Sequence, residues 1–451
     1  MGPCSHCPPE PVRLGRFNFR EIGQVACCFL GAKERFRPQK TENSAPDFEK
    51  TGAILEKIRD YFPPNGGVWL SNGKGAVKSL DSRVSIQRCA QYELATLQEA
   101  VRRLLEPFGG MAAFVRPGDR VLLKPNLLAA HTPEKAVTTH PVVVEAVARL
   151  VRESGGDVWI GDSPAGAVSN IRRFWRLAGL EGVAERLGAR LVTFESGPFF
   201  EVRKNGRRYF FPQVLREADV VINLPKFKTH NLVLFTGAVK NMYGTLPGLQ
   251  KRDFHRVAPN PARFSEILLD VFESLPPTLS ILDAVVGMEG NGPAAGSARP
   301  VGLLLASPDA VALDTVASFL MGFQPEKIPT LREAKKRGLG TARVEDVSVA
   351  GPAPASLRIS DFKLPSNRIF STIPESILKW AGKFLWSRPA ADPAKCTGCG
   401  ICVANCPVQA MTLVHRVATI DYKKCINCLC CDEICPENAM KIEQSWLAAR
   451  L

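Results

Sequence analysis

The sequence predicts an α/β protein, in which a layered and mainly parallel sheet is followed by a small C-terminal α+β domain. Between residues 84 and 350, short apolar runs alternate with amphipathic helical patterns, which is typical of a parallel sheet covered by helices. Beyond this region, one cysteine pattern occurs twice near the C-terminus. The chain has 451 residues, of which 45% are hydrophobic, so it is long enough to build more than one core.

Apolar runs of strand length mark the sheet of the larger domain. They are short, rich in Val, Ile and Leu, and separated by turn residues or helical patterns, as expected for buried strands. We expect strands at Val84–Arg88, Arg120–Lys124, Val158–Ile160, Arg190–Phe194, Val220–Asn223, Ser280–Leu282, Val301–Leu305 and Val347–Ala350.

Two helices and one hairpin have recognisable ends. In residues 140–154, apolar side chains repeat at helical spacing, with Thr139 or His140 as the candidate cap and Gly155-Gly156 as the stop. A second helix is expected at Pro308–Phe319, where Asp309 lies near the positive end of the helix dipole. Residues 199–212 predict a β-hairpin, because Asn205-Gly206 suits a tight turn.

The remaining segments are expected to be less regular. We expect a poorly ordered extension at 1–80, the α/β domain at 81–351, a linker at 352–394 and the cysteine-rich domain at 395–451. Residues 22–32 form a short apolar stretch, for which a disordered leader is favoured over a signal peptide. The linker contains an amphipathic pattern near 377–385, which we expect to pack the two domains together, with a peripheral membrane contact as the alternative.

Charge is distributed unevenly along the chain. The formal net charge is +14, and residues 200–256 carry eleven basic and only four acidic side chains. We do not expect a nucleic-acid-binding protein, because no recognition helix, zinc finger or aromatic stacking motif accompanies this stretch. An anionic small molecule or an acidic redox partner suits it better. No apolar stretch is long enough for a transmembrane segment.

The repeated cysteine pattern predicts iron–sulfur clusters. Each copy runs C-x2-C-x2-C-x3-C-P, the spacing with which bacterial two-cluster ferredoxins hold 4Fe–4S cubanes, so the small domain is expected to be ferredoxin-like. In that arrangement, the fourth cysteine of each run binds the other cluster. Zinc is the alternative, which the doubled triple-cysteine runs disfavour. The expected ligand sets are Cys396, Cys399, Cys402 and Cys435 for one cluster, and Cys425, Cys428, Cys431 and Cys406 for the other.

The cysteine-rich domain also indicates a compartment. Eight of the fourteen cysteines belong to the two runs, and cluster ligands must be reduced thiolates. Cys430 does not fit the spacing and is expected to be a buried or incidental thiol. We therefore expect a cytoplasmic protein with two 4Fe–4S clusters as cofactors.

Polar loops are expected to follow four of the buried strands. These segments begin at Lys124, Gly161, Asn223 and Asp283. Each segment alone is an ordinary turn, flexible loop or solvated edge. The carboxyl ends of parallel strands share one edge of an open sheet, where ligands bind, so four such segments together predict a crevice.

The third of these segments is the most basic. Lysines supply cations and asparagines supply directed hydrogen bonds, a combination that suits a carboxylate or a phosphate. No nucleotide-binding glycine motif is present. His230 and Asp283 are the candidate groups for proton transfer, and His140 and His255 are further candidate proton donors. The candidate ligand-binding residues are Lys124, Asn126, Asn223, Lys226, Lys228, Lys240 and Asn241.

These motifs resemble a known family. The stretch from Asn223 to Gly244, together with Lys124-Pro-Asn126 and Gly161-Asp-Ser163, is similar to the domain of unknown function 362, whose members are also described as uncharacterised iron–sulfur centre proteins. The resemblance covers residues 84–350 and implies an α/β domain with an appended two-cluster ferredoxin. It implies no reaction and transfers no catalytic residue.

We therefore expect an iron–sulfur oxidoreductase. Electrons from a redox partner protein or another external donor would pass through the two clusters to an anionic small molecule in the α/β domain. Two alternatives stay open at this point. In one, the protein is a non-catalytic electron-transfer or assembly partner whose α/β domain docks another protein. In the other, the α/β domain performs a non-redox reaction and the clusters are structural or sensing elements.

Overall fold

The structure is a computed structural model that describes residues 81–166, 170–366, 368 and 386–450. The expected N-terminal extension, with its apolar stretch at 22–32, lies outside the described residues. The amphipathic pattern near 377–385 lies outside them as well. None of the helices in the described residues is both long and apolar enough to cross a membrane.

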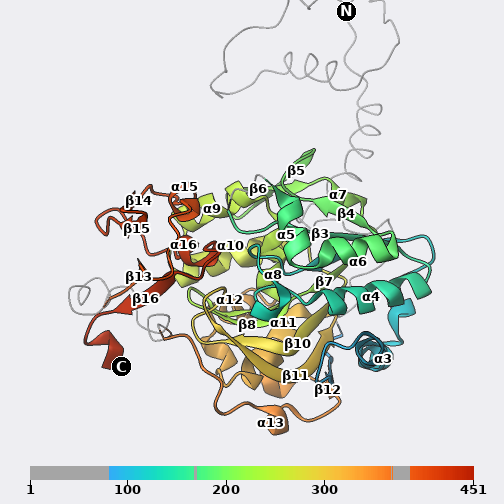
Figure 1. Ribbon diagram of the computed structural model, residues 1–451. Coiled ribbons are helices and arrows are strands. Elements are labelled where there is room, and N and C mark those ends of the chain that lie inside the picture. Colours follow the sequence, from blue (N-terminus) through green and yellow to red (C-terminus); the bar gives the residue numbers. More distant parts are fainter. Residues whose placement is uncertain (1–80, 167–169, 367, 369–385, 451) are drawn as a thin grey trace, which may run out of the picture. The chain divides into compact units, whose positions relative to one another are not determined.

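The larger domain is built on one ten-stranded sheet (Figure 1). Its main path runs β12-β1-β11-β10-β7-β2-β3-β4, while β8 pairs with β10 and β9. Neighbouring strands β10, β7, β2, β3 and β4 are all parallel, whereas β11 is antiparallel to both β1 and β10. The strands are β1 (Val84–Arg88), β2 (Arg120–Pro125), β3 (Asp157–Asp162), β4 (Arg190–Thr193), β7 (Val220–Leu224), β8 (Lys226–His230), β9 (Leu234–Thr236), β10 (Leu279–Glu289), β11 (Ser297–Ser307) and β12 (Val349–Ala350).

Helices cover both faces of this sheet, which confirms the layered α/β prediction. Successive side chains of a strand point to opposite faces, so Val121 and Leu123 enter one core while Leu122 enters the other. The first core contains α3 (Leu94–Leu105), α4 (Pro141–Glu153), α5 (Ile171–Leu177) and α6 (Leu180–Leu187). The second contains α7 (Val214–Glu217), α8 (Ala238–Asn241), α9 (Gly248–Val257), α10 (Pro261–Ser274), α11 (Ala310–Leu320), α12 (Pro329–Lys336) and α13 (Pro354–Leu357).

The expected helix ends and hairpin are present. His140 caps α4, since its Nδ1 accepts a hydrogen bond from the Val142 amide at 3.3 Å. Asp309 caps α11 in the same way, by accepting from two amides of the first turn. The hairpin forms from β5 (Phe199–Lys204) and β6 (Arg207–Pro212). Both Asn205 and Gly206 have positive φ, as a two-residue primed turn requires.

Two segments expected as loops are strands. Lys226–His230 forms β8, and β10 continues through Asp283 to Glu289. The sequence prediction was wrong because lysine and aspartate suggested solvent exposure. In the structure Asp283 stands opposite Lys226 in the register of β10 with β8, so the two charges neutralise each other inside the sheet.

The C-terminal domain is small and internally repeated. It contains β13 (Ser387–Ala391) paired with β16 (Met440–Gln444), β14 (Met411–Val414) paired with β15 (Val417–Ile420), and the short helices α15 (Ile401–Ala404) and α16 (Cys430–Glu433). Four apolar side chains from these strands form its core, and six cysteines of the two runs pack against them. We call residues 396–407 the first repeat and residues 425–436 the second repeat.

Candidate functional site

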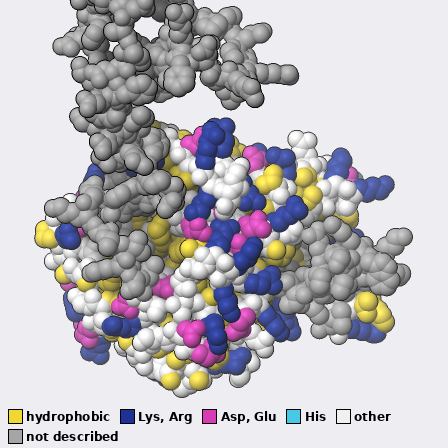
Figure 2. Space-filling view, turned by 180° about the vertical axis from the view of Figure 1, so that it is seen from behind, with side chains coloured by type: hydrophobic (Ala, Val, Ile, Leu, Met, Phe, Trp, Pro, Cys, Tyr) yellow, Lys and Arg dark blue, Asp and Glu magenta, His cyan; other side chains and the backbone are white. Residues whose placement is uncertain are grey.

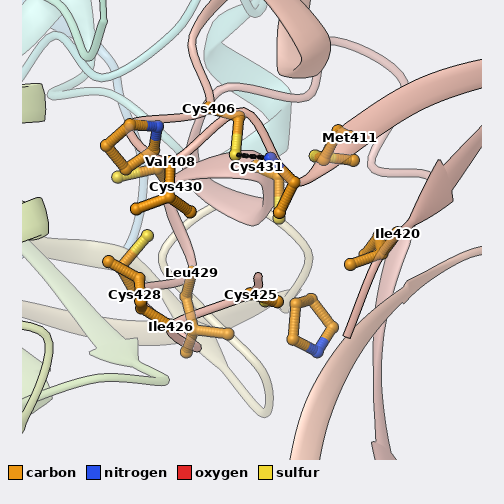
Figure 3. Close-up of a pocket in the computed structure, with 13 residues that line it drawn as sticks. Cys406, Val408, Met411, Ile420, Cys425, Ile426, Cys428, Leu429, Cys430 and Cys431 are labelled. Carbon is orange, nitrogen blue, oxygen red and sulfur yellow. Dashed lines mark hydrogen bonds between the residues drawn. The ribbon is translucent and has the colours of Figure 1, made fainter. Parts of the chain in front are cut away.

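The four cysteines predicted to hold one cluster surround a single pocket (Figure 3). Cys425 and Cys428 precede α16, Cys431 lies within it, and Cys406 comes from the first repeat. Apolar side chains complete the wall of the pocket: Met411, Ile420, Ile426 and Leu429. The pocket therefore combines three cysteines of one run with the fourth cysteine of the other.

The other four cysteines also lie close together. Burial, together with the neighbouring thiols of Cys435, Cys399 and Cys396, raises the pKa of Cys402 to about 11. Neighbouring thiolates repel one another because they carry the same charge, and iron bound among them would relieve that repulsion. The arrangement matches the crossed ligand sets expected from the spacing, and the ligand assignment itself stays a prediction.

Backbone amides support the cysteine sulfurs. The amide of Ala410 donates to Cys406 Sγ at 3.2 Å, and the amide of Ala439 donates to Cys435 Sγ at 3.3 Å. These two bonds occupy equivalent positions in the two repeats. All ten cysteines in the described part of the chain are free, and no three His, Cys, Asp or Glu side chains there form a site for a single metal ion. Free thiols with amide donors fit a 4Fe–4S cluster, whose potential depends on such hydrogen bonds.

Five lysines are buried in the α/β domain, and three of them have clear partners. Lys124 Nζ lies 2.7 Å from Asp162 Oδ1, and Lys226 Nζ lies 2.7 Å from Asp283 Oδ2. Lys251 donates to the Ser163 hydroxyl at 2.6 Å, and that hydroxyl contacts the carboxylate of Glu195. Burial lowers the pKa of Lys251 to about 8. The five members of this lysine cluster are Lys124, Lys226, Lys228, Lys240 and Lys251.

Lys228 and Lys240 lack a carboxylate partner within the α/β domain. Lys228 lies on β8 and donates to the carbonyl oxygen of Val137 at 2.7 Å. Lys240 lies on α8 and has no hydrogen-bond acceptor among the described residues. Burial and the charge of Lys240 hold the pKa of Lys228 well below its ordinary value. Two buried cations side by side favour an anion between or beside them.

Three predicted asparagines form a hydrogen-bonded chain beside these lysines. Asn126 donates to Asn241 at 3.0 Å, Asn241 donates to Asn223 at 2.8 Å, and Asn223 donates to the carbonyl of Ala238 at 3.0 Å. The side-chain oxygen of Asn126 has no hydrogen-bond partner in the described part of the chain. Asn126 is therefore the last residue of this hydrogen-bonded series and has an unused acceptor oxygen, while Asn223 and Asn241 hold strands and loops together.

Asp283 belongs to a separate polar group. Its carboxylate accepts hydrogen bonds from Lys226, from the Tyr92 hydroxyl at 2.8 Å and from the His140 amide at 2.9 Å. The ring of Tyr92 stacks on His140 with 3.6 Å between the ring centroids. The structure thus gives Asp283 a charge-pairing role, and its catalytic role stays a prediction.

His230 faces the C-terminal domain. Its Nδ1 accepts from the amides of Leu232 and Val233 at 3.0 and 3.4 Å, so the proton of the neutral ring lies on Nε2. Burial lowers the pKa of His230 to about 3, which keeps the ring neutral. Its Nε2 lies 3.0 Å from Oε1 of Glu433, on α16.

Several residues at this contact were not expected from the sequence. Asp432 accepts a hydrogen bond from Asn231 at 2.8 Å, directly beside the contact between Glu433 and His230. His131, which was not predicted, and His255, a predicted candidate proton donor, lie close to the backbone of Cys435 and Cys428, respectively. Isolated histidines carry little signal in a sequence. The acidic pair of residues 432 and 433 does carry one, because the first repeat has Val403 and Ala404 at the equivalent positions.

Cys430 also lies at this contact. Its thiol hydrogen-bonds Cys428, and its charge would influence both Lys240 and Tyr243. It is buried, as expected for a thiol outside the cysteine spacing. The second repeat therefore brings a predicted cluster ligand, an additional thiol and a carboxylate to the edge of the lysine cluster.

The basic stretch at 200–256 divides into buried and exposed parts. Its buried lysines belong to the lysine cluster, while its arginines at or near the surface pair with acidic residues, as the half-buried Arg207 does with Asp270 and the exposed Arg208 with Glu201. On the face seen in Figure 2, Lys and Arg side chains lie among Asp and Glu side chains. The basic excess that matters for a small ligand is therefore the buried one.

Comparison with known proteins agrees with both parts of this architecture. The domain of unknown function DUF362 matches residues 121–318, and a 4Fe-4S dicluster domain matches residues 388–436. A relative in Synechocystis sp., named thylakoid-associated protein sll1697, is 41% identical over 283 residues. The aligned region covers 62% of this chain and 87% of that relative. The chain therefore belongs to the DUF362 family, and it is an iron–sulfur protein with a C-terminal domain of the 4Fe-4S dicluster type.

Proposed function

We propose that this protein is an oxidoreductase in which two 4Fe–4S clusters pass electrons to an anionic small molecule bound at Lys228 and Lys240. One observation carries the proposal: the second repeat contacts the part of the α/β domain that carries the lysine cluster, at His230 and Asn231. Glu433 lies 3.0 Å from His230, and Cys430 is close enough to Lys240 to affect its pKa. An electron carrier in contact with an incompletely neutralised basic site is what reduction of a bound anion requires.

The cysteines would hold the clusters in crossed sets. Cys396, Cys399, Cys402 and Cys435 would hold one, and Cys425, Cys428, Cys431 and Cys406 the other. When bound, such clusters supply single electrons at potentials set by their surroundings. Cys430 and Glu433, which lie close to Cys431 of the second set in the sequence, are near Lys240 and His230 of the α/β domain.

The α/β domain would bind and orient the anion. Lys228 and Lys240 would supply positive charge in a region from which water is largely excluded, where Coulomb attraction is strong. The unpartnered oxygen of Asn126 would accept a hydrogen bond from a hydroxyl or protonated group of the ligand. His230 would hold its proton on Nε2 and donate it as a hydrogen bond. The ligand class that this set selects is a small carboxylate or phosphate with a donor group nearby.

The cysteine-rich domain also supports a cellular compartment and a redox partner for the protein. Free cysteines and 4Fe–4S ligands require a reducing environment, which supports the cytoplasm. A separate redox protein would supply the electrons, as ferredoxin-type domains commonly exchange them with partners. Binding of this partner would take place at a surface other than the lysine cluster, which is buried.

The name of the Synechocystis relative supports a second candidate function. A thylakoid-associated relative is consistent with an electron-transfer or assembly partner that docks another protein at a membrane surface. Trp446 and Leu447 follow β16, and 68% and 40% of their surfaces are exposed. An exposed tryptophan next to an exposed leucine suits an interface of this kind.

Binding measurements with matched variants separate the two candidates. Lys228→Met should abolish binding of a small anion that co-purifies with the anaerobically prepared protein, while the visible absorbance of the clusters stays unchanged. Lys336→Met, which removes an exposed lysine of α12, is the control. Unchanged anion binding in Lys228→Met, together with capture of a protein partner by the wild type, would favour the docking function.

A further inference from the structure

The pocket of the second cysteine set is lined by five cysteines, one more than a 4Fe–4S cluster needs. Such a cluster is held by four cysteine thiolates, and the spacing of the two runs accounts for four of the five. The fifth is Cys430, which lies outside that spacing and is drawn with the others in Figure 3. The five cysteines are Cys406, Cys425, Cys428, Cys430 and Cys431.

Cys430 belongs to the wall of this pocket and is not an isolated thiol. It is 8% exposed, and the thiol with which it interacts most strongly is that of Cys428. Cys431 is close enough to interact with it as well. The sulfurs of Cys428 and Cys430 therefore border the same space, and either of them can approach an iron atom that is bound there.

The same backbone turn precedes the short helix of each repeat, but only the second repeat has a thiol after it. Leu429 takes the left-handed conformation, with φ 62° and ψ 12°, and α16 begins at Cys430. Gly400 has φ 74° and ψ 0°, and α15 begins at Ile401. Residue 401 lies 29 positions before residue 430, as each cysteine of the first run does before its equivalent in the second. The first repeat thus has the geometry without the additional thiol.

We propose that Cys430 is an alternative ligand to Cys428, so that the second set holds its cluster with either thiol. The exchange replaces one iron–sulfur bond by another. The Cys430 thiol gives up its proton as it binds, the released Cys428 thiolate takes a proton up, and no electrons are gained or lost. This inference rests on the ligand sets of the proposed function and is independent of the anion site. It gives the second set a reserve ligand that the first set lacks.

Iron analysis and electron paramagnetic resonance of the full-length, anaerobically purified protein test the inference. Cys399→Ala is the matched control, because Cys399 is equivalent to Cys428 while Ile401 stands in place of Cys430. We expect this control to lose one cluster, so that its iron content falls to about half that of the wild type. Cys428→Ala should keep the wild-type iron content, with one set of signals altered by the change of ligand. The double variant Cys428→Ala/Cys430→Ala should fall to about half, like the control.

The outcomes distinguish failure of this inference from failure of the proposed function. If folded Cys428→Ala loses one cluster as the control does, Cys430 is not a ligand and the crossed ligand sets stand. If the double variant keeps the wild-type iron content, neither thiol holds iron. In that case both the inference and the ligand assignment in the proposed function are wrong.

A gain of iron in the first repeat covers the case in which Cys428→Ala does not fold. Ile401→Cys, combined with Cys399→Ala, places a thiol where the second repeat has Cys430, after a turn of the same conformation. We expect this combination to recover the iron that Cys399→Ala alone loses. If the iron content stays at that of Cys399→Ala, a thiol at this position does not replace the missing ligand, and the proposal is wrong.

Discussion

The two cysteine repeats have the same spacing but different surroundings. In the first repeat, Cys399 is exposed, and Gly400 takes the left-handed conformation that precedes α15. In the second, the equivalent Cys428 is buried, and the left-handed position before α16 is occupied by Leu429. Leucine tolerates this conformation poorly, whereas glycine adopts it freely.

The difference shows that the second repeat is fitted to the α/β domain. Leu429 is 6% exposed and belongs to the same hydrophobic core as α8, α10 and α11. Burial of a leucine side chain in that core offsets the strain of its backbone. With the acidic pair at 432 and 433, the second repeat has both apolar and charged anchors that the first repeat lacks.

Among the substitutions that test this difference between the repeats, replacement of a cluster ligand should have the largest effect. Cys406→Ser removes a residue of the first repeat, yet we expect it to abolish the cluster held by the second repeat, because the fourth cysteine of each run crosses over. Electron paramagnetic resonance of the reduced protein should show one set of cluster signals lost. Cys430→Ser is the control and should retain both sets. Loss of the cluster held by Cys396 and Cys399 instead would contradict the crossed assignment.

Leu429→Ala should lower the free energy of unfolding by about 3 kcal/mol, because it removes a buried side chain and leaves a cavity. The backbone stays in the left-handed region, so the strain is not relieved. Leu413→Ala, at an exposed position of β14, should change stability by less than about 0.5 kcal/mol. Urea unfolding under anaerobic conditions measures both. Equal effects of the two variants would mean that Leu429 does not anchor the second repeat.

Anion binding should weaken as pH rises. Burial lowers the pKa of Lys228, so this lysine loses its proton at a lower pH than an exposed lysine does. The anion binds the protonated form, and affinity should therefore fall by about tenfold per pH unit above the pKa of Lys228 in the folded protein. Lys240, Lys226, Glu433 and Asp162 are the charged neighbours that modulate this pKa.

Lys228→Arg checks the assignment of this pH dependence. Arginine stays protonated at all accessible pH values, so the affinity of this variant should depend less steeply on pH than that of the wild type, with Lys240 as the remaining titrating cation of the site. Calorimetric titrations between pH 6 and about 10 provide the comparison. A slope equal to that of the wild type would assign the titration to another group.

Gly400→Ala should have the smallest effect. Its φ of 74° lies in the left-handed region, where alanine is less stable than glycine by about 1 kcal/mol. The nearest atom to an added Cβ is a leucine methyl group at 3.8 Å, so no clash adds to this strain. The thermal midpoint should fall by a few degrees. A fall as large as that of Leu429→Ala would remove the contrast between the repeats.

The sequence was sufficient to predict the eight strands on the main path of the sheet and two of the helices that cover it. Apolar runs such as those at β2, β3 and β7 carry their own signal, and the caps of α4 and α11 depend on neighbouring residues alone. The cysteine spacing likewise indicated the 4Fe–4S domain, because each run contains its own pattern.

Residues that depend on partners distant in the sequence were harder to predict. β8 was expected to be a loop because Lys226 and Lys228 are charged, and only its pairing with β10 shows that Asp283 neutralises Lys226. The contact between His230 and Glu433 joins positions about 200 residues apart. No local pattern in a single sequence contains this information.

Redox titration of the lysine variant Lys240→Met tests most directly whether the second repeat and the lysine cluster form one functional unit. Removal of a nearby positive charge disfavours the reduced, more negative cluster, so we expect the midpoint potential of one cluster to become more negative while that of the other is unchanged. Equal shifts of both potentials, or no shift of either, would contradict a functional unit of the second repeat and the lysine cluster.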